Sequence, residues 1–182
     1  MKTRLTLSRK ALRVCFGSVA ILGLLMACSQ SVPKALVALE PDSDTACAVD
    51  GMLLVDYPGP KGQTHYAEGK PDFYCDLMDL FAMLLAPEQK RVATAVFVQD
   101  MGKTAWDHPI GNWIDAKQAI YVSGSKKLGS MGPTLASFSQ LADAEAFVAK
   151  EGGKIIRFEQ VTLDMVGSNK TEGMDAHDDA MH

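Results

Sequence analysis

The chain has 182 residues, of which 47% are hydrophobic and 22% are charged, and its formal net charge is −4. This length and apolar content suit one compact domain or two small ones. The excess of acidic residues argues against nucleic-acid binding, because nucleic-acid-binding proteins need basic surfaces to contact phosphates. The sequence contains no GxSxG, HExxH or phosphate-loop motif, so it offers no recognisable catalytic set.

The first 27 residues have the features of an export signal. Five basic residues and no acidic residue precede an apolar run at 14–27, and Cys28 follows directly. This order resembles a bacterial lipoprotein signal, after which Cys28 would be the lipid-modified first residue of a periplasmic protein. An ordinary cleaved signal and an uncleaved anchor are the alternatives. Ser29 favours the outer membrane.

Removal of residues 1–27 would leave 155 residues and change the net charge to −9, because this segment holds five basic and no acidic residues. The remaining chain has no polybasic surface for a membrane, so the lipid would be the anchor. Its free thiols would be Cys47 and Cys75. In an oxidising compartment two cysteines often form a disulfide. A thiolate pair for a metal and two unrelated thiols are alternatives, since this spacing matches no standard zinc motif.

The first half of the chain predicts two strands after a linker. We expect a flexible linker at 28–46 and a folded part that starts near Cys47. Residues 52–55 predict a short buried strand, residues 57–62 form a turn rich in proline and glycine, and residues 63–67 predict the returning strand.

A helix and a central strand are expected next. The helix is predicted to open at Lys70-Pro71-Asp72, to carry its apolar stripe between Leu77 and Leu85, and to end at Pro87. The β-branched run at 92–99 predicts a strand. Residues 47–103 therefore predict a first ββαβ unit.

The second half has a similar order of elements, which predicts a second ββαβ unit with its linker at 104–166. The fold class expected from this order is α+β. The expected elements are a linker at 106–115, strands at 119–122, 135–139 and 154–162, a glycine-rich turn at 124–132, and a helix at 142–150 that Gly152 and Gly153 end.

The carboxyl-terminal residues 167–182 have no apolar periodicity, so we expect them to be disordered. Their histidines, methionines and aspartates either collect copper or other divalent ions weakly or belong to a solvated tail.

Methionines beside glycines are the most informative pattern in the chain. Met52, Met101, Met131 and Met174 are each bonded directly to a glycine, which marks turns and strand ends. A thioether is a neutral, soft ligand that suits Cu(I). Packing is the alternative, because methionine is also a versatile core residue. His65, in a polar segment, is a further candidate ligand.

Short motifs with these methionines occur in a specific order. Gln99-Asp100-Met101-Gly102 and Met131-Gly132-Pro133 are the most specific of them. With these motifs the chain from Cys47 to Met165 resembles the NosL family, copper-binding lipoproteins that accompany nitrous oxide reductase in denitrifying bacteria. The other matching segments are 50–52, 56–61, 70–76, 113–116 and 124–125.

The resemblance implies a periplasmic Cu(I) metallochaperone, not an enzyme. Such a protein delivers copper for the copper-sulfide centre of nitrous oxide reductase, together with a membrane transporter complex. The implied fold is two ββαβ units with a topology like that of alkylmercury lyase.

The family pattern also implies the copper ligands. The methionine of its Gln-Asp-Met motif matches Met101, which ranks first. Met52 and Met131 rank next, followed by Cys75, His65 and Cys47. Many relatives carry a cysteine pair near Cys47, where this chain has a single cysteine. At the start of the first helix, the thiolate of Cys75 would be favoured by the helix dipole.

Two other functions stay open. A metal-independent lipoprotein scaffold would hold protein partners together and would depend on the exposed segment from Trp106 to Trp113. An enzyme like organomercurial lyase would need a reactive cysteine pair beside a carboxylate. The separation of Cys47 and Cys75 in sequence offers that arrangement only weakly.

Overall fold

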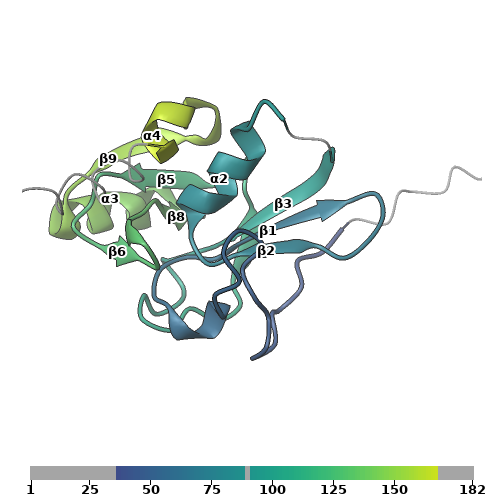
Figure 1. Cartoon of the computed structure of the whole chain (residues 1–182). Helices are drawn as coiled ribbons and strands as arrows, with labels where there is room; N and C mark the ends of the chain where they lie inside the picture. The colour runs from purple at the N-terminus through teal and green to yellow at the C-terminus, as the bar shows by residue number, and fades with distance from the viewer. Residues whose placement is uncertain (1–35, 89–90, 168–182) are drawn as a thin grey trace, which may run out of the picture. The chain divides into compact units, whose positions relative to one another are not determined.

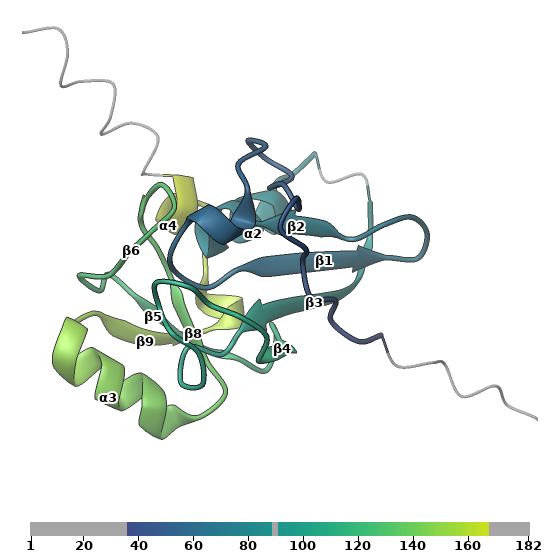
Figure 2. The ribbon, with the colours of Figure 1, turned by 90° about the horizontal axis from the view of Figure 1, so that it is seen from below.

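The computed structural model describes residues 36–88 and 91–167, whose strands form two small sheets and a hairpin (Figures 1 and 2). The first sheet has the order β2-β1-β3-β4 and the second β8-β5-β9, while β6 pairs with β7. All pairings are antiparallel. The strands are β1 Gly62–Tyr66, β2 Asp72–Tyr74, β3 Ala93–Gln99, β4 Trp113–Asp115, β5 Ile120–Ser123, β6 Leu128–Gly129, β7 Gly132–Pro133, β8 Ala136–Phe138 and β9 Lys154–Arg157.

Helix α2, Leu77–Leu85, packs on the first sheet and against α4, Leu163–Gly167 (Figure 1). It begins where Asp76 accepts a hydrogen bond from the Met78 amide at 2.8 Å, an ordinary N-cap arrangement. Its side chains Leu77, Leu80 and Phe81 are buried. A Cβ at Gly62 would lie 2.7 Å from Leu80, so this close approach of α2 to β1 requires glycine.

Helix α3, Leu141–Glu151, covers the second sheet, with contacts to β5, β8 and β9 (Figure 2). It ends at Gly152, whose φ is +76° and whose amide donates to the Val148 carbonyl at 2.9 Å. Gly153 has φ +98°, and a Cβ there would lie 2.7 Å from the Ser123 carbonyl oxygen. The predicted glycine stop is therefore confirmed.

One hydrophobic core joins the two sheets. Its buried residues come from α2 and β3 of the first half and from β5, β9 and α4 of the second. Phe81 of α2 meets Tyr121 of β5 edge to face, with ring centroids 5.2 Å apart. The two halves therefore share their largest core, while β5, β8 and α3 also form a smaller cluster of their own.

The predicted α+β fold class is confirmed. Each sheet contains a β-β-α-β run with its first strand in the middle, β1-β2-α2-β3 in one and β5-β8-α3-β9 in the other. Residues 113–115, expected in the linker, instead form β4 and extend the first sheet. The likeness to alkylmercury lyase stays a prediction.

Three local predictions were wrong. The strand expected at 154–162 ends at Arg157, and residues 158–160 form a 3-10 helix. The other two lie in the first half of the chain. Residues 54–56 form a short 3-10 helix rather than part of a strand, and Leu53 makes only an isolated bridge with Ala46. Residues 72–74 form β2 because they pair with β1, so the helix begins at Leu77 and not at Lys70. In both places tertiary contacts outweighed the local pattern.

The described part of the expected linker lies against the first sheet. Glu40 accepts hydrogen bonds from the Gly111 amide at 3.0 Å and from Trp113 Nε1 at 2.7 Å. Gln63 exchanges two hydrogen bonds with the backbone of Leu39. Cys28, the signal segment and residues 168–182 of the expected tail lie outside the described residues. No described helix has both the length and the apolar character needed to cross a membrane.

Candidate metal centre

Cys47 and Cys75 meet beside the edge strand β2. The segment that carries Cys47 is held there because the Ala48 amide donates to the Phe73 carbonyl at 2.8 Å. Cys75 lies between β2 and the N-cap of α2, and its amide points at Cys47 Sγ at 3.5 Å. Both side chains are buried, and neither forms a disulfide.

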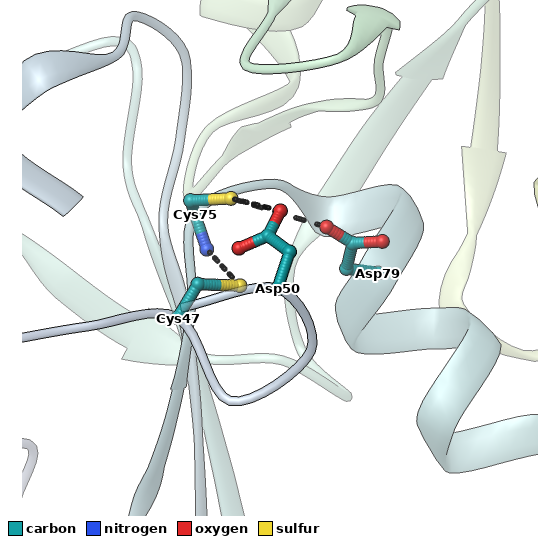
Figure 3. Close-up of side chains that lie close together, drawn as sticks. All are labelled: Cys47, Asp50, Cys75 and Asp79. Carbon is teal, nitrogen blue, oxygen red and sulfur yellow. Dashed lines mark hydrogen bonds between the residues drawn. The ribbon is translucent and has the colours of Figure 1, made fainter. Parts of the chain in front are cut away.

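Two carboxylates complete the cluster, as Figure 3 shows. Cys47, Asp50, Cys75 and Asp79 each offer a ligand atom, and these four atoms all lie within 4.8 Å of one another. Cys75 Sγ is 3.9 Å from an oxygen of Asp50 and 3.9 Å from an oxygen of Asp79. Asp50 is exposed and Asp79 half-buried, so the cluster faces solvent on its carboxylate side.

The pKa values of the two thiols are shifted in opposite directions. The pKa of Cys47 is lowered, chiefly because its sulfur accepts a hydrogen bond from Cys75. The same interaction raises the pKa of Cys75, and burial raises it further. The hydrogen bond between the two side chains therefore favours Cys47 over Cys75 as the thiolate in the metal-free protein. An effect of the helix dipole on Cys75 stays a prediction.

Asp76 holds the β6–β7 hairpin beside the cluster through hydrogen bonds. Its buried carboxylate accepts hydrogen bonds from Thr134 Oγ1 at 2.6 Å and from the Ser130 amide at 3.2 Å. Burial raises the pKa of Asp76, and these hydrogen bonds oppose that rise. The Cys75 thiol in turn donates to Ser130 Oγ at 3.2 Å. The hairpin thus forms one wall of the site.

Two of the methionines expected as ligands lie close to this cluster. Met52 packs against Cys47 and Cys75 as a partly buried neighbour. Met131 follows Ser130 in the hairpin and is 68% exposed. Met52 therefore lies beside the thiols, while Met131 is the residue next to Ser130, whose hydroxyl contacts Cys75.

The structure places the other two candidates elsewhere. Met101 packs in a separate hydrophobic cluster with Trp106 and Phe147, and its amide donates to the Ser137 carbonyl. His65 is buried in β1, where Nε2 is 2.7 Å from Gln63 Oε1. Burial lowers the pKa of His65. As copper ligands, Met101 and His65 stay predictions.

The two carboxylates were not among the ligands expected from the sequence. Asp50 lies within one of the segments that resemble the family, 50–52, and Asp79 lies in none of them. A usable signal exists, because each cysteine has an aspartate three or four positions later, Cys47 with Asp50 and Cys75 with Asp79. The separation of the two cysteines in sequence no longer argues against an enzyme like organomercurial lyase, because the fold brings both cysteines beside carboxylates.

The arrangement suits a soft metal ion. Thiolate and thioether sulfur are the donors that Cu(I) prefers, while carboxylates suit harder cations. The fold and this site together define the class of the protein, a small α+β protein with a cysteine-based candidate centre for a soft metal.

Comparisons with known proteins give the family. The chain belongs to the NosL family, whose model matches residues 38–166. It is 38% identical to a protein named copper-binding lipoprotein NosL from Stutzerimonas stutzeri, over 77% of each chain. It is also 38% identical to the protein of that name from Achromobacter cycloclastes, over 81% of this chain and 79% of the relative.

A solved structure supports the fold. The crystal structure of the copper chaperone NosL from Shewanella denitrificans matches with a TM-score of 0.65 and 40% identity, over 71% of this chain and 97% of the other. The predicted family is therefore confirmed.

Proposed function

We propose that this protein binds Cu(I) at the Cys47–Cys75 pair and serves as a copper chaperone. The observation that carries the proposal is the position of two free thiols whose sulfurs lie within 4.8 Å of each other. Two thiolates at this distance can bind Cu(I) in a linear or trigonal arrangement, with Met52 or Met131 as a third donor. The names of the relatives, copper-binding lipoprotein and copper chaperone, point to the same cargo.

The family resemblance supplies the rest of the proposal. The protein would be exported to the periplasm, anchored through lipid on Cys28, and placed at the outer membrane. It would hand copper to nitrous oxide reductase for assembly of the copper-sulfide centre, with a membrane transporter complex as its second partner. Reversible thiolate and thioether binding suits transfer, because sulfur ligands exchange Cu(I) with one another readily.

The test is an anaerobic Cu(I) titration of the mature protein against a chromophoric chelator. The comparison variants are Cys75→Ala, Met101→Leu and a chain truncated after Lys170. Binding that is lost in Cys75→Ala but kept in the other two variants would support the proposed centre. Binding lost only on truncation would move the site to the tail. Absence of competitive binding in the unaltered protein would favour the metal-independent scaffold.

A second candidate function follows from the carboxylates beside the thiols. Two cysteines can bind mercury of an organomercurial cation, while an adjacent aspartate passes a proton to carbon. In this step the carbon–mercury bond breaks, a carbon–hydrogen bond forms, and both sulfurs bind Hg(II). One thiol proton goes to carbon, the other goes to water, and no oxidant is needed.

Incubation with phenylmercury would test this activity directly. About one equivalent of benzene per protein, absent in Asp50→Asn, would support it. Binding of phenylmercury without release of benzene would rule out this activity and would not affect the copper proposal.

A further inference from the structure

A buried ammonium group lies next to the candidate metal centre. Lys61 is only 2% exposed, and its Nζ donates to the carbonyls of Tyr57 at 2.8 Å, Pro58 at 3.0 Å and Cys75 at 3.1 Å. These three bonds satisfy all the donors of the ammonium. They do not neutralise its charge, because the acceptors are uncharged, and a buried charge without a counter-charge is costly. Its position therefore calls for an explanation.

The negative charge that Lys61 faces belongs to the centre itself. The ammonium interacts favourably with Cys75, Asp76 and Cys47. Both thiols must lose their protons to bind a metal ion. Two thiolates with one Cu(I) carry a net charge of −1, and Asp76 adds to it. The loaded centre therefore carries a negative charge that the ammonium of Lys61 can offset.

The backbone of Lys61 is fixed independently of the cysteines. The backbone amide of Lys61 donates to Gln99 Oε1 at 3.0 Å, and the backbone amide of Gln99 donates to the Lys61 carbonyl at 3.2 Å. Gln99 ends β3 and directly precedes the Asp100-Met101 turn. The ammonium is therefore held at a fixed place by the sheet and reaches from there to the Cys75 peptide.

We infer that Lys61 is a positioning residue of the metal centre, which holds the Cys75 peptide and supplies the positive charge that offsets the Cu(I)–dithiolate. This inference rests on the proposed function. It extends that function to a residue outside the ligand set. A purely structural lysine would stabilise the fold and leave the Cu(I) affinity of the folded protein unchanged.

The first test compares Lys61→Met, which removes the charge at similar length, with Lys61→Arg, which keeps it. Tyr121→Phe is the matched control, because it removes a buried hydrogen bond to the Ala116 carbonyl in a different hydrophobic cluster from that of the cysteines. Anaerobic Cu(I) competition is measured on the mature, full-length chain of each variant, with folding checked by circular dichroism.

We expect Lys61→Met to bind Cu(I) about 10- to 100-fold more weakly, as for other residues that support metal ligands. Lys61→Arg should bind more tightly than Lys61→Met, and Tyr121→Phe should bind like the unaltered protein. Equal affinities of Lys61→Met and the unaltered protein would overturn the inference, and so would equal affinities of the methionine and arginine variants. If the unaltered protein did not bind Cu(I), the proposed function would fail instead.

A second measurement does not depend on whether Lys61→Met folds. In the unaltered protein labelled with ¹⁵N-lysine, the ammonium signal of Lys61 is followed by NMR as Cu(I) is added. We expect this signal to shift on loading, while that of Lys150, paired with Glu151 at 3.4 Å, stays in place. An unchanged Lys61 signal in the loaded protein would contradict the inference.

Discussion

Asp100 organises the turn that carries Met101. Its buried carboxylate accepts hydrogen bonds from the amides of Gly102 and Ser139, each at 3.1 Å, and from the Ser139 hydroxyl. Lys103 adds an ion pair at 3.1 Å. One side chain therefore joins the end of β3 to the segment between β8 and α3, and it fixes the backbone on which Met101 stands.

These bonds make stability depend on pH. Burial alone would raise the pKa of Asp100, but the hydrogen bonds from Ser139 and Lys103 outweigh burial and lower it. A carboxylate whose pKa is lower in the folded state stabilises the protein above its unfolded pKa of about 3.9. That contribution is lost as the pH falls through the lower, folded pKa.

We predict that Asp100→Asn lowers the free energy of unfolding at pH 7 by about 2 kcal/mol or more, because charged, buried acceptors contribute strongly. The variant should also lose less stability than the unaltered protein when the pH falls below about 4. Urea unfolding at pH 7 and pH 3 measures both quantities, with the exposed Asp107→Asn as control. A parallel pH dependence in Asp100→Asn would contradict this account.

At the scale of single residues, the sequence predicts which side chains could bind a metal better than it predicts where those side chains lie. The methionine–glycine pairs were visible, and the structure places Met52 against the cluster that holds both cysteines and Met131 next to Ser130, which contacts Cys75. Met101, ranked first, packs in another cluster. A motif shows that a residue type recurs at a turn, but which turns converge depends on tertiary packing. Asp50 and Lys61 were missed for this reason.

At the scale of elements, the β6–β7 hairpin depends on one glycine. A Cβ at Gly129 would collide with the Asp76 carboxylate and would lie 2.9 Å from Thr134 Cβ. Asp76 is also the N-cap of α2 and the acceptor for the Ser130 amide. Gly129 therefore lets the hairpin approach the start of the helix.

We predict that Gly129→Ala destabilises the protein by about 1–3 kcal/mol, the usual cost of overpacking, and weakens metal binding by moving Ser130. Gly167→Ala is the control, because a Cβ there meets nothing within 4 Å. Thermal unfolding and Cu(I) competition are the measurements. Equal stability of the two variants would show that the hairpin does not need this close approach.

The segment around Glu40 is a second element with a testable role. Its carboxylate holds the Gly111 amide and the Trp113 indole, so it fastens the start of the described chain to β4. We predict that Glu40→Ala speeds amide hydrogen exchange at Gly111 and in residues 36–44, with little change in core amides. Asp44→Ala serves as the control. Unchanged exchange at Gly111 would mean that the segment is held by other contacts.

Sequence predicted the regular elements and missed those that exist through pairing. Helix α2 and strand β3 have long, consistent patterns. Strand β3 forms close to its expected bounds, and α2 forms over its expected apolar stripe although it begins at Leu77 rather than at Lys70. The three-residue strands β2 and β4 have no such pattern. They are strands because β1 and β3 offer them free edges, which only the folded sheet provides.

At the scale of the whole molecule, the shared core is what assembles the site. Cys47 and Cys75 are separated by 28 positions, and Ser130 comes from the other half of the chain. The Ala48–Phe73 backbone hydrogen bond and the hydrogen bond from the Ser130 amide to Asp76, at the start of α2, bring these residues together on this core. A single sequence shows that an aspartate follows each cysteine, but it does not show that the two segments converge, so the cysteine pair could be proposed as a metal pair but not placed in one site with Asp50 and Asp79.

Copper X-ray absorption spectroscopy would show whether both cysteine sulfurs bind Cu(I). The spectrum of the Cu(I)-loaded, unaltered protein is compared with those of Met101→Leu and Cys75→Ala at equal copper content. The account predicts that sulfur scattering is unchanged in Met101→Leu and reduced in Cys75→Ala. Sulfur scattering that fell in Met101→Leu and stayed constant in Cys75→Ala would contradict it and place the centre at the Gln-Asp-Met turn.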